Sequence, residues 1–410
     1  MPVCSFSVSI PVELSVPGMP QNDIHGPVVY LIAGEPSGDA LGGRLMAALK
    51  QETVGNIRFA GVGGPEMQAE GLTSLFPMSD LAVMGLAEVV PRLPLLTRRI
   101  RQTRENIRTI SPNALVTIDA PDFSFRVARA LTGENIPLIH YVAPSVWAWR
   151  PGRARKIAAF LDHLLTLLPF EPPYFEREGL SCTFVGHPVI EGPAMQADGV
   201  AFRKRHGIAP SETIVVALPG SRAGEVSRHL PIFEQTFTRL AKRHEHIRVV
   251  VIAAGLVADT VQTAANQWQI PTKTIADPAE KYHAMAAGNI ALAASGTVAL
   301  ELAAVGTPAV ITYRVNPITA WIGRRLIRIR FASLVNLILD REATPERLQN
   351  ECRAEILSAE LHRLLSSPDH IRQQQDAYRD ALQHLTGQGD GGPSRQAARA
   401  VLRIINNLSK

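Results

Sequence analysis

Short apolar runs alternate with stretches of helical periodicity along most of the chain. In the first half, the apolar runs that predict strands lie at 28–33, 57–61, 114–118, 137–142 and 163–168. Amphipathic stretches separate them at 39–50, 95–110 and 123–131. Strands that alternate with helices are typical of a parallel sheet with helices on both faces. The pattern therefore predicts an α/β fold whose first domain is a doubly wound, Rossmann-like sheet.

The alternation stops and then restarts in the second half. Residues 186–198 are rich in glycine and proline and predict a linker. Strand-like runs follow at 213–218, 247–254, 272–275, 289–294 and 308–313, again with helices between them. The tail from about residue 346 is expected to be helical and polar, with a glycine-rich break at 387–393. We expect two doubly wound domains facing each other across a cleft, with ligands beyond the carboxyl ends of the strands.

Length and composition agree with this division. The chain has 410 residues, more than one ordinary core holds, and 46% hydrophobic with 19% charged residues is a globular composition. The net charge of +5 suits an anionic substrate or lipid surface and does not single out nucleic acid, so no nucleic-acid partner is expected. The three cysteines, Cys4, Cys182 and Cys352, are scattered, which argues against disulfides and metal sites and fits a reducing cytosol.

The apolar segments do not predict a membrane span, because no run of 18 or more apolar residues occurs. Residues 1–20 are apolar, but four prolines interrupt them and no basic leader precedes them. We therefore expect residues 1–26 to be a disordered N-terminal extension, or Met19 to be the true start, rather than a signal peptide.

The loop after the first strand reads GEPSGD from residue 34 to 39. Its glycines are four residues apart and no Walker lysine follows, so the loop supports neither NAD binding nor ATP hydrolysis. Because glycine permits close approach to a ligand, we regard Gly34, Glu35, Ser37, Gly38 and Asp39 as candidates that line the cleft. The alternative, a tight turn in which Asp39 caps the next helix, stays open.

Two loops in the second half follow strands and open helices, where backbone N–H groups bind anions. The first loop contains Gly220, Ser221 and Arg222, and the second contains Ser295, Gly296 and Thr297. The fork of Arg222 matches a phosphate, and Glu301, one helical turn beyond Thr297, can accept hydrogen bonds from two ribose hydroxyls. Ordinary helix starts, with an exposed Arg222 and a paired Glu301, are the alternative. The loops predict a site for a nucleotide-linked substrate.

Asp119 directly follows the strand at 114–118, where a carboxylate faces the cleft and can act as a general base. For Asp122, three residues later, we prefer the capping of a helix. No Asp-x-Asp pair occurs in the chain, so a metal-held diphosphate has no support. The positive charge must then come from arginine and from helix N-termini, and no metal or other cofactor is expected.

A loop at 140–150 contains Ser145, Trp147 and a second tryptophan, and could line the ligand cleft or simply pack as an aromatic loop. His187 lies at the linker, where it could touch substrate or serve as a hydrogen-bonded structural histidine.

Two apolar stretches rich in arginine, 81–108 and 321–339, could lie in a lipid interface, although ordinary amphipathic packing explains most helices of this kind. In the first stretch, the candidates for membrane contact are Leu86, Val89, Val90, Leu93 and Leu96. Pro91 and Pro94 favour an irregular, exposed element there.

Together these motifs resemble the lipid-A-disaccharide synthase family, glycosyltransferases of the two-domain GT-B fold. The matching strings are AGEPSGD (33–39), LAVMGL (81–86), IDAPDF (118–123), HYVAPSVWAWR (140–150), LLPFE (167–171), FVGH (184–187), LPGSR (218–222) and ASGT (294–297). They occur in family order from about residue 28 onward, and the long aromatic string is highly specific. Pro36 stands where alanine is common, and residues 1–26 match nothing.

The resemblance implies that UDP-2,3-diacylglucosamine donates its sugar to 2,3-diacylglucosamine 1-phosphate in a single inverting displacement. It implies that Asp119 takes the proton of the acceptor 6-hydroxyl, Arg222 stabilises the leaving diphosphate and Glu301 holds the ribose. Asn336 also aligns with the family's donor site. Acyl-chain length cannot be read from the sequence.

The resemblance also implies a peripheral enzyme on the cytoplasmic face of the inner membrane, docked through the region 86–96. The expected division is an extension at 1–26, an acceptor and membrane-facing domain at 27–190 and a UDP-sugar domain at 191–360. C-terminal helices at 361–410 are expected to return to the first domain, and an exchange of these helices within a homodimer is an option.

Two other functions fit the loops alone. One is another two-domain UDP-sugar enzyme, such as an epimerase or a transferase with a soluble acceptor, which the apolar and arginine-rich stretches disfavour. The other is a non-catalytic carrier of lipids or nucleotide sugars, which Asp119 disfavours.

Overall fold

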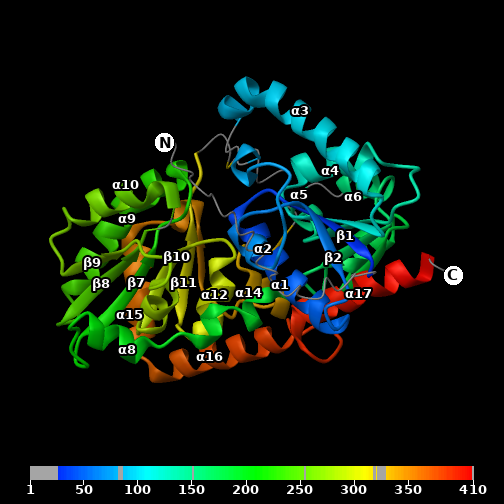
Figure 1. Ribbon diagram of the computed structural model, residues 1–410. Helices are drawn as coiled ribbons and strands as arrows, with labels where there is room; N and C mark the ends of the chain where they lie inside the picture. Colours follow the sequence, from blue (N-terminus) through cyan, green and yellow to red (C-terminus); the bar gives the residue numbers. More distant parts are fainter. Residues whose placement is uncertain are drawn as a thin grey trace, which may run out of the picture.

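Two parallel six-stranded sheets with helices around them make up the computed structural model of the protein (Figure 1). The structure describes residues 26–81, 86–149, 152–253, 255–316, 320 and 329–408, and for residues 86–92, 149 and 408 it describes the backbone alone. The doubly wound α/β architecture expected for both halves is confirmed.

The first sheet has the strand order β2-β1-β3-β4-β5-β6. Its strands are β1 (Val28–Ala33), β2 (Arg58–Val62), β3 (Ala114–Ile118), β4 (Leu138–Tyr141), β5 (His163–Thr166) and β6 (Ser181–Phe184). Every residue of β1 and β3 is buried, because helices cover both faces. The order reverses between β1 and β3, so the loops after these two strands meet at a topological switch point.

The second sheet repeats this plan with the order β12-β11-β10-β7-β8-β9. Its strands are β7 (Thr213–Leu218), β8 (Ile247–Ile252), β9 (Thr272–Ile275), β10 (Ile290–Ala294), β11 (Ala309–Tyr313) and β12 (Glu346–Leu348). Its switch point lies between β7 and β10. The two loops that we expected to bind a nucleotide follow these two strands, so the sheet topology brings them together.

Helices pack on both faces of each sheet (Figure 1). Those of the first half are α1 (Pro36–Glu52), α2 (Pro65–Ala69), α3 (Leu86–Ile110), α4 (Pro121–Arg129), α5 (Val146–Trp149), α6 (Gly152–Ala158) and α7 (Pro172–Glu176). Those of the second half are α8 (Gly199–Arg205), α9 (Ala223–Ala241), α10 (Ala258–Ala265), α11 (Lys281–Ala286), α12 (Val298–Val305), α14 (Leu334–Leu339) and α15 (Ala354–Leu365). Two short 3-10 helices, at Pro188–Glu191 and Pro193–Gln196, form the linker.

Two further helices, α16 (Pro368–Gln383) and α17 (Gly392–Leu408), end the described chain. The helix α16 buries Tyr378 and Ala381 in the core of the second domain, whereas α17 buries Ala397 and Val401 in the core of the first, against α1 (Figure 1). The expected segment 361–410 is therefore divided, and only its last helix returns to the first domain. Periodicity marks the apolar face of a helix and does not identify the core that it meets.

Three elements differ from the sequence prediction. The short strand β6 was missed, because its residues are polar or half-buried at the sheet edge. The strand β12 replaces the helix expected at residue 346 and pairs with β11. The helix α3 continues through Pro91 and Pro94, so the irregular element expected there is wrong; the helix persists although each proline lacks an amide donor.

Candidate functional site

The loops at the two switch points line two adjoining cavities. One cavity, of about 340 Å³, has Ser37, Gly38 and Asp119 of the first domain opposite Thr297 and Glu301 of the second. The other, of about 400 Å³, is lined by the two predicted nucleotide loops together with residues around them: Gly220, Ser221, Arg222, Glu225, Lys281, Ser295, Gly296, Thr297 and Glu301. Thr297 and Glu301 belong to both, so the cavities meet at these side chains.

Asp119 is held in an unusual backbone conformation at the end of β3. Both Asp119 and Ala120 have positive φ angles, 48° and 43°, which residues other than glycine rarely adopt. The backbone N–H of Asp119 donates to the carbonyl of Tyr141 at 3.0 Å, and its carbonyl accepts the hydroxyl of Ser124 at 2.9 Å. Such strain persists only where the surroundings fix it, and it is common at active sites.

Burial raises the pKa of the Asp119 carboxyl above its ordinary value, while a hydrogen bond from the Ala120 backbone opposes this shift. A second acid, Glu35, lies close enough for the two charges to interact. Burial first, and the charge of Asp119 second, raise the pKa of Glu35, and the charge of Arg222 acts in the opposite direction. Glu35 therefore lies near enough to interact both with the candidate base of the first domain and with the candidate phosphate ligand of the second.

The glycines of the loop after β1 allow it to pack closely on β3. A Cβ atom on Gly34 would lie 2.8 Å from the Cβ of Ala120, closer than real side chains approach. Asp39, in contrast, is buried and points away from the cavities. Its carboxylate accepts backbone N–H groups of Gly64, Glu66 and Met67 at 2.7–3.2 Å and so caps α2. Asp39 therefore does not line the cleft as expected. It caps α2, whereas the sequence analysis had considered capping of the helix that follows the loop, α1.

The loop after β7 is closed by Glu225, a residue that the sequence analysis did not single out. Its carboxylate accepts from Arg222 at 2.9 Å, from the hydroxyl of Tyr313 at 2.9 Å and from the backbone N–H of Ser221 at 3.3 Å. Gly220 needs its φ of +119°, and a Cβ there would lie 2.8 Å from Glu225. The signal in the sequence was an acid three residues after Arg222, in the first turn of a helix.

Arg222 keeps most of its side chain, 75%, exposed to solvent. Although burial acts to raise the pKa of Glu225, hydrogen bonds from Tyr313 and Arg222 hold it below its ordinary value. Glu225 is therefore an anion that orients Arg222 at the mouth of the cavity. A diphosphate that entered the loop would meet a guanidinium already in place.

The loop after β10 is fixed by contacts to both neighbouring segments. The backbone N–H of Ser295 donates to Thr312 at 2.8 Å, and its hydroxyl donates to the carbonyl of Ala332 at 3.0 Å. Glu301, one turn along α12, accepts from Lys281 at 2.7–2.8 Å and from the hydroxyl of Tyr282 at 3.0 Å. Glu301 therefore lines both cavities as a paired carboxylate, so a ribose would share it with Lys281.

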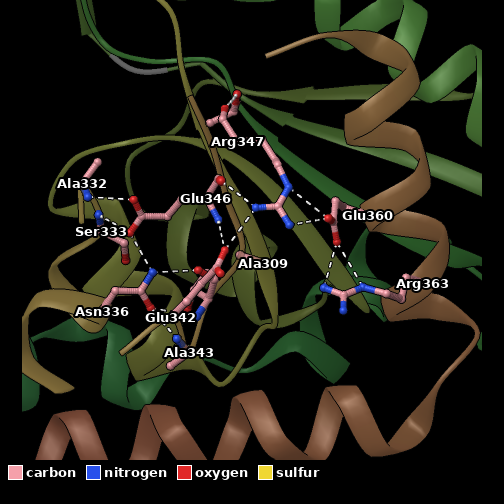
Figure 2. Close-up of polar contacts among 12 residues, drawn as sticks. Ala309, Ala332, Ser333, Asn336, Glu342, Ala343, Glu346, Arg347, Glu360 and Arg363 are labelled. Atoms are coloured by element: carbon pink, nitrogen blue, oxygen red, sulfur yellow. Dashed lines mark hydrogen bonds and ion pairs between the residues drawn. The ribbon is translucent and has the colours of Figure 1, made fainter. Parts of the chain in front are cut away.

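Asn336 does not face either cavity. It is fully buried in α14, where its amide N–H₂ donates to the carbonyl of Thr344 and to Glu346, both at 2.7 Å. Its oxygen accepts the backbone N–H groups of Ala343 and Thr344 at 2.8 Å (Figure 2). All the hydrogen-bonding groups of its side chain are used within the protein, so none is left to bind the UDP-sugar donor. This is contrary to the donor-site role expected from the sequence.

Asn336 nevertheless supports the loop after β10, which contains Ser295, indirectly. Glu346, which it contacts, also accepts the backbone N–H groups of Ala332 at 2.7 Å and Ser333 at 2.8 Å (Figure 2). The carbonyl of the same Ala332 accepts the Ser295 hydroxyl. Through Glu346, the amide of Asn336 therefore helps to fix Ala332, the residue that accepts the hydrogen bond of Ser295.

Replacing Asn336 by alanine is expected to destabilise the second domain by about 2–4 kcal/mol, because buried groups of Thr344, Glu346 and Ala343 lose their partner. Urea unfolding of the two proteins measures this difference. The exposed Asn266, at the end of α10, provides a control, and its alanine variant should stay within about 0.5 kcal/mol of wild type. Equal stability of both variants would contradict the structural role of Asn336.

His187 lines one of the two cavities, whereas the described part of the aromatic loop does not. His187 lines the cavity of Asp119, and its Nδ1 accepts the backbone N–H of Val189 at 3.1 Å. Burial, and then the charge of Arg44, lowers the pKa of His187 to about 4, so its ring is neutral. Trp147 donates to the buried Glu171 at 3.2 Å and packs on Phe170, and neither it nor Ser145 lines the two cavities. The rest of that loop, from the side chain of residue 149 through residue 151, lies outside the described residues.

Arg44 is a second cavity residue that the sequence analysis missed. It projects from α1 into the cavity of Asp119, beside His187 and Tyr282. Its Nε is buried without a hydrogen-bond partner, and within the described ranges it makes no ion pair. An arginine on a mostly apolar helix was the only signal. The cavity therefore holds an arginine that forms no ion pair with the described residues, although the carboxylates of Asp119 and Glu301 line the same cavity.

The expected membrane contacts lie on α3. Leu93 is 39% exposed and Leu96 is half-buried, whereas the side chains of Leu86, Val89 and Val90 lie outside the described residues. The first part of the second arginine-rich stretch, 321–328, lies outside them as well. In the described part of the chain, no helix is both long enough and apolar enough to cross a bilayer.

Two parallel sheets whose switch points share a pair of adjoining cavities define a two-domain enzyme of the GT-B class. In agreement, the UDP-GlcNAc 2-epimerase of Neisseria meningitidis bound to UDP-GlcNAc superposes with a TM-score of 0.63 at 12% identity, covering 92% of this chain and 99% of the epimerase. At that identity the likeness concerns the fold alone.

The sequence comparisons identify the family. The family model for lipid-A-disaccharide synthetase matches residues 29–401. The lipid-A-disaccharide synthase of Rhodospirillum centenum is 55% identical over 92% of this chain and 94% of its own, and that of Paramagnetospirillum magneticum is 50% identical over 92% and 97%. The chain belongs to the lipid-A-disaccharide synthetase family, and it is a glycosyltransferase of lipid A biosynthesis.

Proposed function

We propose that the enzyme transfers the sugar of UDP-2,3-diacylglucosamine to 2,3-diacylglucosamine 1-phosphate, with inversion at the anomeric carbon. The observation that carries this proposal is the cavity in which Asp119 of the first domain lies opposite Thr297 and Glu301 of the second. The domain at 27–190 would supply the acceptor side and the domain at 191–360 the UDP side. A base and a leaving-group site on opposite walls are what a single displacement requires.

In this mechanism Asp119 accepts the proton of the acceptor 6-hydroxyl as the oxygen attacks the anomeric carbon. The bond from this carbon to the diphosphate breaks, and UDP leaves with the electron pair. Arg222 and the N–H groups at the starts of α9 and α12 offset the charge that develops on the diphosphate. The raised pKa of Asp119 brings its basicity nearer to the working pH, which favours proton transfer.

Inversion is tested by following the anomeric proton of the product by NMR, with EDTA present throughout. A β-1,6-linked disaccharide formed at an unchanged rate in EDTA would agree with the proposal. An α-linked product, or a rate lost in EDTA and restored by a divalent cation, would contradict inversion or metal independence respectively.

Arg44 gives the acceptor cavity a charge complementary to the acceptor phosphate. It lines the same cavity as Asp119 and lacks an ionic partner within the described chain. An arginine fork that binds a phosphate forms charge-assisted hydrogen bonds. We therefore place the 1-phosphate of the acceptor near Arg44, with its 6-hydroxyl toward Asp119.

Changing Arg44 to methionine should raise the KM for the phosphorylated acceptor by about tenfold or more, because a charge-assisted hydrogen bond is lost. Steady-state kinetics with an acceptor that lacks the phosphate provides the control, since wild type and variant should then agree. Arg58→Met, an exposed arginine on β2, should leave both KM values unchanged. A variant that loses equal activity toward both acceptors would rule out this role for Arg44.

The acyl chains of both substrates give a physical reason for membrane association, since each buried methylene contributes about 0.8 kcal/mol. We propose a peripheral position on the cytoplasmic face of the inner membrane, with α3 toward the lipid. Supporting this are the exposed Leu93 and the arginines that follow it along α3. Co-sedimentation with anionic vesicles tests the proposal, and a protein that stays in the supernatant would contradict it.

Analytical ultracentrifugation would distinguish a monomer from the homodimer that the family resemblance permits.

A further inference from the structure

A third cavity, of about 300 Å³, lies between α3 and α4 in the first domain. Most of its walls are apolar: Leu81, Leu93, Leu96, Ile100 and Phe123 line it. Phe123 is buried and packs edge-on against Phe76, so one wall is firm. Leu81, Leu96 and Ile100 are half-buried, because one side of each faces this space. A core would fill such a space to close packing, and an apolar cavity of this size is of the kind that accepts a ligand.

The cavity opens beside the reacting groups. Glu35, Ala120 and Pro121 also line it, and Ala120 directly follows Asp119 in the chain. The loop after β1 packs directly against this lining, because a Cβ on Gly34 would lie 2.8 Å from Ala120 and 3.7 Å from Leu81. A molecule with a polar head at Asp119 could therefore place an apolar tail here.

The rim of the cavity is polar. Asp122 and Arg126, both exposed on α4, lie at its edge. Neither makes an ion pair with any residue that the structure describes. An arginine at the entrance suits the carbonyl or hydroxyl oxygens near the head of a fatty acyl group. The cavity thus combines a polar rim with an apolar interior, and it lies next to the candidate base Asp119.

We propose that this cavity, lined by Leu81, Leu93, Leu96, Ile100 and Phe123, holds a fatty acyl chain of the acceptor and so limits the chain length that the enzyme accepts. The inference rests on the proposed function and adds to it the site of a substrate tail. The acceptor is favoured over the donor because every residue of the lining belongs to the first domain, whereas the loops that would hold UDP belong to the second.

The test is the kcat/KM of purified full-length enzyme in mixed micelles, measured with acceptors of short and long acyl chains at a fixed donor. Ile100→Trp narrows the cavity and should lower kcat/KM for the long-chain acceptor by about 15-fold, because each methylene that loses its burial costs about fourfold and about two are displaced. The short-chain acceptor should change by less than about twofold. Val54→Trp, at a site 95% exposed and remote from the cavity, is the control for an added tryptophan.

Leu96→Ala enlarges the cavity and should shift the preference toward longer acceptors, the opposite of Ile100→Trp. A folding defect would instead lower activity toward both lengths equally, so the opposed shifts separate the two explanations. Parallel chain-length profiles in wild type and both variants would overturn the inference. A change confined to the chain length of the donor would also overturn it, since the occupant would then be the donor. If wild type formed no disaccharide at all, the proposed function itself would fail.

Discussion

Asp119→Asn is expected to lower kcat by about 10²–10⁴-fold, the range typical for removal of a general base, while the affinity for UDP stays unchanged. The amide is nearly the same size as the carboxylate, so the strained turn at Asp119 and Ala120 can persist. It cannot accept the proton of the acceptor hydroxyl. Single-turnover kinetics measures the loss, and calorimetry with UDP verifies that the donor loops remain intact.

The pH dependence gives a second readout for Asp119. Burial raises the pKa of this carboxyl, and the base acts in its deprotonated form. The rate should therefore fall as the pH drops through a value above the ordinary aspartate pKa of about 4. Asp259→Asn, at an exposed position on α10, should show neither effect. If Asp119→Asn turned over normally, the base would have to be sought at Glu35, the neighbouring acid whose pKa burial also raises.

Arg222→Met is expected to lower kcat/KM by about 10²–10³-fold, because the leaving diphosphate loses the guanidinium that offsets its developing charge. Part of the loss should appear as weaker UDP binding. Removal of the arginine also leaves Glu225 at the loop with only Tyr313 and the Ser221 N–H as partners. Its negative charge would then face the diphosphate without compensation, which adds to the effect.

The matched control is Arg228→Met, six residues further along the chain and within α9. Arg228 is half-buried and donates to the backbone carbonyl of Arg314, outside the two nucleotide loops. Its variant should retain the UDP affinity and most of the turnover. Calorimetry that found equal UDP affinity in wild type and Arg222→Met would remove Arg222 from the donor site.

The two switch points could be predicted from the sequence because they depend on local signals. Apolar runs identified β1, β3, β7 and β10, and the glycines, Ser221, Arg222 and Asp119 followed these runs directly. The carboxyl ends of parallel strands meet at one edge of a sheet, so the position of these residues followed from the strand order. The candidate base and the nucleotide loops consequently needed no tertiary information beyond the fold class.

What the sequence did not predict depends on contacts between distant segments. Asp39 caps α2 from 25 residues away, and the side-chain oxygen of Asn336 accepts backbone N–H groups of the turn that precedes β12. Arg44 faces the linker, which lies more than 140 residues later in the chain. Residue type and spacing did not distinguish these side chains from ligands, because a buried polar group is satisfied by whichever partner the fold supplies.

The most direct test of the proposed reaction is reconstitution from purified components. Purified protein is incubated with UDP-2,3-diacylglucosamine and 2,3-diacylglucosamine 1-phosphate, and the lipid fraction is analysed by mass spectrometry. The proposed reaction yields a tetra-acylated disaccharide monophosphate together with one equivalent of UDP, formed by wild type and absent with Asp119→Asn. Wild-type protein that released no UDP, or that altered the donor without joining it to the acceptor, would contradict it.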